Sequence, residues 1–254
     1  MALRSVALHL SLAAALLASV MFACTKTETT YVDEDDDDDD TTVDSGSGKP
    51  PADSGLGILG FKPEVMYSGF DGEHTYMVPF AVYDADDDLT VTASPAASVS
   101  FEKVELRNPV TENGTDLGRY YMVTVKAPGE VTFTAKSKNR TATGVLNVAT
   151  YTPAAWAAGK ARYENGIAGD AKNPPCTDCH QNGQDIDHSP AALATVTDEK
   201  IGFTISTGLS TNNRPIDVDE TRYPDGHKWK TKDAEEQAAV VTYLRGLEPR
   251  GFRK

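Results

Sequence analysis

The residues best suited to chemistry in this sequence are Cys176, Cys179 and His180, in the run Cys-Thr-Asp-Cys-His. The spacing C-x-x-C-H is that of a c-type haem attachment site. Two thiols three residues apart reach the two vinyl groups along one edge of a porphyrin. The adjacent histidine is then held under the iron, where an imidazole nitrogen binds. The sequence therefore predicts one covalently bound haem c, attached by Cys176 and Cys179, with His180 as the proximal iron ligand.

Two other chemistries use the same spacing. Two cysteines together with His180 and His188 could bind zinc, although Cys179 and His180 are adjacent and would struggle to reach one tetrahedral ion together. A redox dithiol also uses C-x-x-C, but the strand-to-helix setting of such sites is absent from this part of the sequence. The apolar N-terminal segment predicts export, which favours haem because c-type attachment occurs outside the cytoplasm.

Two helices are expected on either side of the cysteine pair. Thr152-Pro153 can cap a first helix, in which Trp156, Gly159 and Tyr163 share one face. The run Asp233-Ala234-Glu235-Glu236 has capping-box spacing and opens a last helix. The apolar side of that helix is supplied by Val240, Val241, Tyr243, Leu244 and Leu247, and Gly246 and Pro249 mark its end.

With the haem motif between these two helices, residues 151–254 resemble the single-haem cytochrome c family. The resemblance implies an all-α domain in which the first and last helices cross, with Gly159 and Tyr163 meeting Tyr243, Leu244 or Leu247. It also implies a middle helix, which begins at Thr197-Asp198-Glu199-Lys200 and ends at Gly208.

The resemblance also assigns a role to Pro190, ten residues after His180. In the family, the residue at this place has a carbonyl that accepts a hydrogen bond from the haem histidine and so fixes the orientation of its ring. The alternative is a proline that simply starts a helix after Ser189.

His227 is expected to be the second axial ligand of the iron. Family members usually supply a methionine there, but no methionine follows Met122, and His227 stands at the matching place. His188 is the alternative, although eight residues after His180 is a short span for reaching the other haem face. An open or lysine-ligated iron is the third possibility. Trp229 is expected to pack against the haem edge or the domain core.

Residues 58–150 are expected to form an all-β unit. Val, Thr, Tyr and Phe recur with period two between turn residues, over residues 76–82, 89–93, 99–106, 120–126, 131–135 and 141–148. Short strands at this spacing predict an antiparallel sandwich. The closing stretch, residues 142–148, resembles bacterial immunoglobulin-like domains, which implies a spacer or a protein-binding surface. The aspartates of residues 84–88 fit a solvated turn better than a calcium loop.

Residues 1–23 are expected to be an export signal, because Arg4 is followed by an apolar stretch and small residues. Met21-Phe22-Ala23-Cys24 resembles the lipobox of bacterial lipoproteins, which implies cleavage before Cys24 and lipidation of its thiol. An ordinary cleaved signal is the alternative. Residues 24–57, with six consecutive aspartates and a Ser/Gly/Pro stretch, are expected to form an extended tether.

The predicted fold class is therefore multidomain, an all-β immunoglobulin-like sandwich followed by an all-α cytochrome c domain. The boundaries are 1–23 for the signal, 24–57 for the tether, 58–150 for the sandwich and 151–254 for the cytochrome domain. The 254 residues carry a net charge of −14, which argues against a nucleic-acid partner, because phosphate contacts need clustered lysine and arginine.

These features predict an exported, lipid-anchored electron carrier of the bacterial cell envelope, facing the periplasm or the cell surface. The alternatives are a haem enzyme and a gas-sensing or binding module, both of which need an open iron position. The expected partners are a membrane, reached through the lipid anchor, and a redox protein. The cluster Lys228, Lys230 and Lys232 would dock an acidic redox partner or form a solvated face.

Overall fold

The computed structural model describes residues 57–111, 114–170, 173–180, 187–210, 212–216, 227, 229, 231 and 233–253. All of these belong to one compact unit, residues 52–254. The expected export signal, Cys24, nearly all of the acidic tether and the lysines at 228, 230 and 232 lie outside the described residues. Among the described helices, none combines the length and the apolar character needed to cross a membrane.

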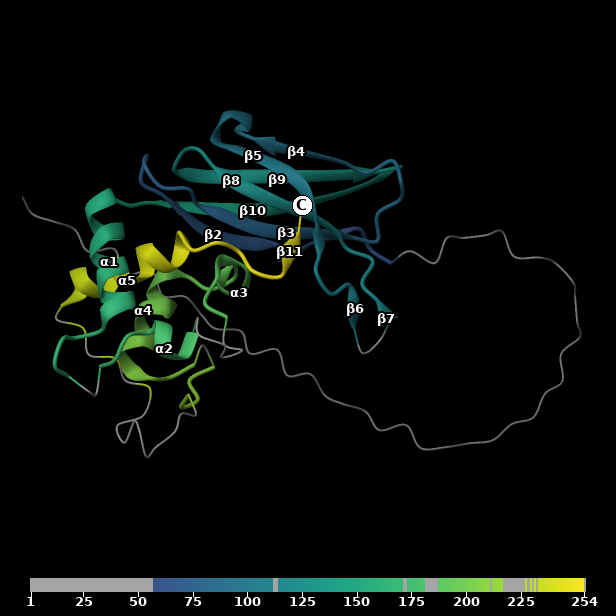
Figure 1. The fold of residues 1–254 in the computed structure, drawn as a ribbon. Helices are drawn as coiled ribbons and strands as arrows, with labels where there is room; N and C mark the ends of the chain where they lie inside the picture. The colour runs from purple at the N-terminus through teal and green to yellow at the C-terminus, as the bar shows by residue number, and fades with distance from the viewer. Residues whose placement is uncertain are drawn as a thin grey trace, which may run out of the picture. The chain divides into compact units, whose positions relative to one another are not determined.

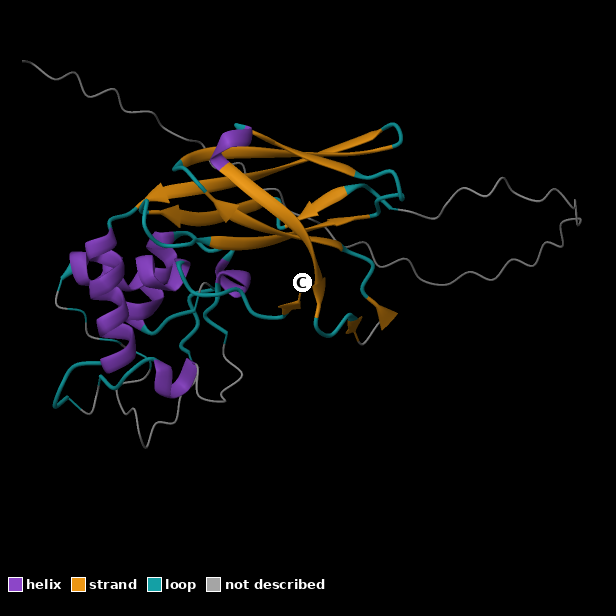
Figure 2. Cartoon of the chain, turned by 45° about the horizontal axis from the view of Figure 1, so that its top comes forward, coloured by secondary structure: helices purple, strands orange, loops and turns teal. Residues whose placement is uncertain are grey.

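Most strands of the unit form two layers (Figures 1 and 2). One sheet has the order β1-β3-β8-β5-β11 and the other β2-β10-β9-β4, while β6 and β7 pair separately. All strand pairs are antiparallel except β2 with β10, which is parallel. The strands are β1 (Gly60–Lys62), β2 (Val65–Phe70), β3 (Met77–Tyr83), β4 (Thr90–Ser94), β5 (Val99–Leu106), β6 (Val110–Thr111), β7 (Gly114–Thr115), β8 (Arg119–Val125), β9 (Gly129–Ser137), β10 (Arg140–Thr150) and β11 (Phe252–Arg253).

The helices all follow β10, apart from one short 3-10 turn, Ala96–Ser98, before β5. They are α1 (Pro153–Asn165), α2 (Thr177–His180), α3 (Pro190–Leu193), α4 (Asp198–Thr207) and α5 (Ala234–Arg245). The expected caps are present: Thr152 Oγ1 accepts from Ala155 N, and Asp233 Oδ1 accepts from Glu236 N. Thr197 caps α4, and Gly208 ends it in the left-handed conformation.

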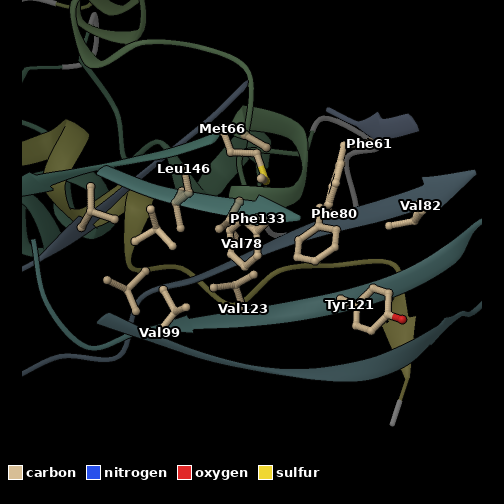
Figure 3. Close-up of a cluster of buried hydrophobic side chains, with 14 of the residues drawn as sticks. Phe61, Met66, Val78, Phe80, Val82, Val99, Tyr121, Val123, Phe133 and Leu146 are labelled. Atoms are coloured by element: carbon tan, nitrogen blue, oxygen red, sulfur yellow. The ribbon is translucent and has the colours of Figure 1, made fainter. Parts of the chain in front are cut away.

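A hydrophobic core fills the space between the two sheets (Figure 3). Alternation supplies it: in β9, Val131, Phe133 and Ala135 are buried while their neighbours are not. Aromatic rings gather around Phe80, whose ring centroid lies 4.9 Å from that of Phe133 and 5.1 Å from that of Tyr121. The predicted sandwich is therefore confirmed. Its six expected strands are all present, and β1 and β2 are strands that the sequence pattern did not reveal.

The α1 and α5 helices cross at Gly159. A Cβ atom on Gly159 would lie 1.9 Å from Ala239 O, so only glycine permits this approach. Tyr243 lies beside the crossing, with its ring 5.2 Å from Trp156 and 5.4 Å from Tyr163. The expected contact between the first and last helices is thus confirmed. It forms the centre of a second, smaller core.

The C-terminal segment does not form a separate all-α domain, so the predicted fold class is wrong. Its chain ends in β11, which pairs with β5 of the sandwich. Ala194 is 3% exposed and belongs to the core between the sheets, and its carbonyl accepts a hydrogen bond of 2.8 Å from Tyr67 N in β2. Two of the five helices have only four residues. The C-terminal segment therefore buries part of its apolar surface against the sandwich. The boundary between residues 150 and 151 stays a prediction.

Arg245, at the end of α5, is fully buried and joins the two parts of the unit. Its guanidinium donates to the carbonyl oxygens of Tyr67 (3.3 Å), Leu193 (2.8 Å) and Val196. It also pairs with Asp198 Oδ1 at 2.9 Å. A buried cation is tolerated only when its hydrogen bonds are satisfied, and these acceptors come from β2, α3, α4 and the link between those two helices.

We predict that Gly159→Ala lowers the free energy of unfolding by about 1–3 kcal/mol, because overpacking at the crossing outweighs the gain in helix propensity. Gly202→Ala is the matched control, since its Cβ would meet only the flexible end of the Gln237 side chain, at 3.1 Å. Its stability should stay within about 1 kcal/mol of wild type. Urea denaturation measures both. Equal stability of the two variants would contradict the close approach.

We also predict that Arg245→Gln lowers the free energy of unfolding by about 3–5 kcal/mol, because the carbonyls and Asp198 lose their buried donor. The control is Arg253→Gln, which removes an exposed ion pair with Glu105 (2.9 Å) and should cost less than about 1 kcal/mol. Thermal and chemical denaturation compare them. A small effect at Arg245 would show that it does not hold the helices to the sandwich.

Candidate functional site

Cys176 directly precedes α2 and Cys179 lies within it, and this short helix is tied to α1. Cys176 N donates to Tyr163 O at 2.9 Å, and Cys176 O accepts from the backbone nitrogens of Cys179 (3.2 Å) and His180 (3.0 Å). In a helical turn, residues three and four apart share one face. Cys176, Cys179 and His180 therefore present their side chains on the same side of one turn, as the attachment chemistry requires.

The burial of Cys176 bears on whether the cysteine pair could be a redox dithiol. It raises the pKa of the Cys176 thiol to about 12, so this sulfur is protonated at neutral pH. A redox dithiol needs an attacking cysteine with a lowered pKa and an exposed thiolate. The environment of Cys176 is the opposite, and it disfavours the dithiol alternative.

His180, at the end of α2, lies close to two other histidines, His188 and the more distant residue His227. The His180 ring is buried and stacks on the His188 ring with centroids 3.4 Å apart. The His227 ring lies 6.1 Å from the His180 ring and is nearly perpendicular to it. Burial lowers the pKa of His227, and burial and the neighbouring positive charges lower that of His188 to about 3. Both are therefore neutral imidazoles at pH 7, the form that binds metals.

The ring distances from His180 distinguish His188 from His227 as candidates for the second axial ligand. Two imidazoles on opposite sides of one metal ion need about 6 Å between their ring centres, from two bonds of about 2 Å and about 1 Å within each ring. The separation of His180 and His227 agrees with this value. Rings stacked at 3.4 Å leave no room for an ion, so His188 does not stand opposite His180 in this arrangement.

Several buried polar atoms around these rings have no hydrogen-bond partner among the described residues. They are His188 Nδ1, His227 Nδ1, Tyr163 Oη and Trp229 Nε1. Unsatisfied buried groups are uncommon in folded proteins, and each costs about 1–3 kcal/mol. Tyr163, His188 and His227 belong to one group of neighbouring rings, so a group bound beside them would satisfy their atoms, whereas the Trp229 ring lies against Arg162. The residue set, two thiols and facing imidazoles, fits a covalently attached haem.

A cavity of about 460 Å³ opens beside the histidines. His180, His188 and Tyr163 line it, together with Arg107 from the end of β5 and Arg250 before β11. The sequence analysis missed both arginines. No local pattern connects residue 107 to a site near residue 180, because only the pairing of β11 with β5 brings them together.

Trp229 and Pro190 are placed as follows. Trp229 is half-buried, its backbone nitrogen donates to Ile205 O at 2.8 Å, and its ring faces the Arg162 guanidinium at 5.4 Å. Pro190 begins α3 after Ser189, which matches its alternative interpretation as a helix-starting proline. Contact of Trp229 with a haem, and the role of the Pro190 carbonyl, stay predictions.

Within the described ranges, no three or more His, Cys, Asp or Glu side chains are grouped so that they could hold a metal ion. The zinc alternative for Cys176, Cys179, His180 and His188 therefore finds no support there. A haem iron takes four of its bonds from the porphyrin, so the protein supplies at most two.

Comparisons with known proteins identify no family for this chain. No family model matches it, and no curated protein matches it. Among solved structures, domains 1–6 of the surface layer protein SbsC match with a TM-score of 0.27 and 20% identity, over 39% of this chain and 13% of that one. Domains 4 and 5 of SbsC match with a TM-score of 0.24 and 17% identity, over 37% of this chain and 46% of that one. The match thus spans less than half the length of either structure.

These findings overturn the assignment to the cytochrome c family. No model of that family matches, and residues 151–254 do not form the separate all-α domain that the resemblance implied, because β11 pairs with β5 of the sandwich. The prediction that the chain is an electron carrier of that family is therefore wrong, as are its alternatives as a haem enzyme or gas sensor. Which residues would hold a haem is a separate question that the comparisons do not address.

Both similarities have TM-scores far below 0.5, so they carry no argument about where this chain is located. The expectation of a cell-envelope location rests on the N-terminal segment, residues 1–23. Nothing in the comparisons concerns a lipid anchor.

Proposed function

We propose that this chain is a cell-envelope protein that attaches one haem covalently through Cys176 and Cys179, with His180 and His227 as axial ligands. The proposal concerns the cofactor and its site, and it includes neither membership of the cytochrome c family nor a role as an electron carrier. Two observations support it: Cys176, Cys179 and His180 lie within one hydrogen-bonded turn, and the His227 ring lies 6.1 Å from the His180 ring.

Each residue would have a defined task. The thiols of Cys176 and Cys179, which lie within one turn, would form the thioether links by adding across the two vinyl groups of the haem. His180 and His227 bind as neutral imidazoles. The haem supplies an iron that changes oxidation state by one electron. Tyr163 and His180 are themselves 1% and 6% exposed, so His180 would bind the iron from a buried position.

The location in the envelope is supported by the apolar N-terminal segment, which predicts export. Lipidation of Cys24 would add an anchor in the membrane. Residues 24–57 would then act as a tether, and the sandwich would carry the site away from the membrane surface. A redox protein as partner stays a prediction, as does the absence of a nucleic-acid partner.

We predict that the full chain, exported in a host with haem-attachment machinery, carries a haem that remains on the denatured polypeptide. Cys176→Ser and Cys179→Ser should each lose one thioether link, and the double variant should lose covalent haem. Haem staining after denaturing electrophoresis and mass spectrometry measure this. Cys24→Ser, which lies outside the unit, is the control and should keep its haem. A wild-type chain without covalent haem would refute the proposal.

We predict further that His227→Ala opens the iron to carbon monoxide, whereas His188→Ala does not. The reason is the 6.1 Å separation of the His180 and His227 rings, against 3.4 Å for His180 and His188. The visible spectrum of the reduced protein, with and without the gas, reports the change. Gas binding in His188→Ala alone would reverse the assignment of the second ligand.

A further inference from the structure

The cavity beside His180 and His188 is distinct from the place proposed for the haem. Neither cysteine of the attachment turn lines it, and neither does His227. Much of its wall is the segment that follows α5, since residues 247–252 all contribute. Its volume of about 460 Å³ lies in the range of small-molecule sites. An occupant of this cavity would therefore be a ligand other than a haem held by those residues.

Two exposed arginines lie at the open side of the cavity. Arg107 Nε donates to Phe252 O at 3.1 Å, and Arg250 N donates to Ser189 Oγ at 3.2 Å, which fixes where both side chains begin. Within the described part of the chain, the terminal nitrogens of Arg107 and the Arg250 guanidinium have no hydrogen bond or ion pair. Glu248 is the acidic residue of the lining, so two guanidinium charges stand against one carboxylate. This side of the cavity favours an anionic group.

The inner side of the cavity offers hydrogen-bonding atoms without partners. Tyr163 is 1% exposed, and its Oη has no hydrogen-bond partner among the residues that the structure describes; the same holds for His188 Nδ1. Leaving such an atom buried and unpaired costs about 1–3 kcal/mol, which a polar group of a ligand would recover. Leu247, Pro249 and Phe252 add apolar surface to the wall. The lining therefore suits a ligand with an anionic end, an apolar body and a second polar group.

We propose that this cavity binds a small organic carboxylic acid, with its carboxylate on Arg107 and Arg250 and a second polar group on Tyr163 Oη. A guanidinium presents parallel donors that match the two oxygens of a carboxylate. The buried hydroxyl of Tyr163 then discriminates among acids, because a ligand without a matching polar group leaves it unpaired. The proposal goes beyond the haem site and does not depend on it.

The test measures binding of three probes to the full chain by isothermal titration calorimetry. The probes are 4-hydroxybenzoate, benzoate and phenol, which carry both polar groups, the carboxylate alone and the hydroxyl alone. We expect 4-hydroxybenzoate to bind most tightly. Benzoate should bind about two- to tenfold more weakly, because it lacks one hydrogen bond to a neutral group. Phenol should bind most weakly, because it has nothing for the two arginines.

Variants assign the two ends of the ligand. Arg107→Gln and Arg250→Gln should each weaken 4-hydroxybenzoate about tenfold, and the Lys variants, which keep the charge, should recover part of the loss. Tyr163→Phe keeps the ring in the core and should make 4-hydroxybenzoate and benzoate bind equally. Arg119→Gln is the matched control, because Arg119 pairs with Asp87 at 3.4 Å in the sandwich and does not line the cavity. It should bind all three probes as wild type does.

Several outcomes would overturn the proposal. They are no binding of 4-hydroxybenzoate to wild type, phenol binding as tightly as the two acids, and unchanged affinity in both Gln variants. Inorganic phosphate that displaces 4-hydroxybenzoate with equal affinity would show that the arginines respond to negative charge alone. The ranking of the probes on wild type is a test that needs no variant, so a variant that does not fold leaves the proposal open to refutation. Haem staining is a separate measurement, so failure of this proposal leaves the proposed attachment untouched.

Discussion

The structure depends on the burial of one positive charge. Arg245 has no exposed surface, and its donors are satisfied only where β2, α3 and α4 all present oxygen atoms to it. Removing such a cation from water costs several kcal/mol, so the arrangement persists only while every acceptor stays in place. The same contacts that satisfy the charge therefore fix the end of α5 against β2. They also fix the direction in which the chain leaves α5 toward β11.

That direction determines the cavity. From Arg245 the chain passes Pro249 and Arg250 and reaches β5 within a few residues, where Phe252 pairs with Leu106. Arg250 bonds to Ser189 on the way. Because Ser189 follows His188 directly, the sandwich edge and the histidine site are joined through a short, hydrogen-bonded path. The site residues that the sequence predicts all lie in the last hundred residues. The cavity beside His180 and His188 is nevertheless lined in part by Arg107, which follows strand β5 of the sandwich.

Local features of the sequence predicted local structure well. The caps at Thr152, Thr197 and Asp233 and the six alternating segments depend on neighbours within a few residues, and the structure contains them. The sequence did not predict how these strands and helices group into domains. Nothing in the pattern of residues 246–253 indicates a strand, since β11 has only two residues and exists through its pairing with β5. The parallel pairing of β2 with β10 is likewise a long-range event that no hairpin signal marks.

The candidate site shows the same division between local and distant information. The relation of Cys176, Cys179 and His180 is set within one turn and follows from spacing alone. The choice between His188 and His227 depends on where each ring lies relative to His180 in space. The number of residues between them and His180 is only an indirect guide to that position. In the structure the nearer residue in sequence also has the nearer ring, and that closeness argues against it, because the two protein ligands of a haem iron would lie on opposite faces of the porphyrin. His188 instead stacks on the His180 ring and lines the same cavity as Arg107 and Arg250.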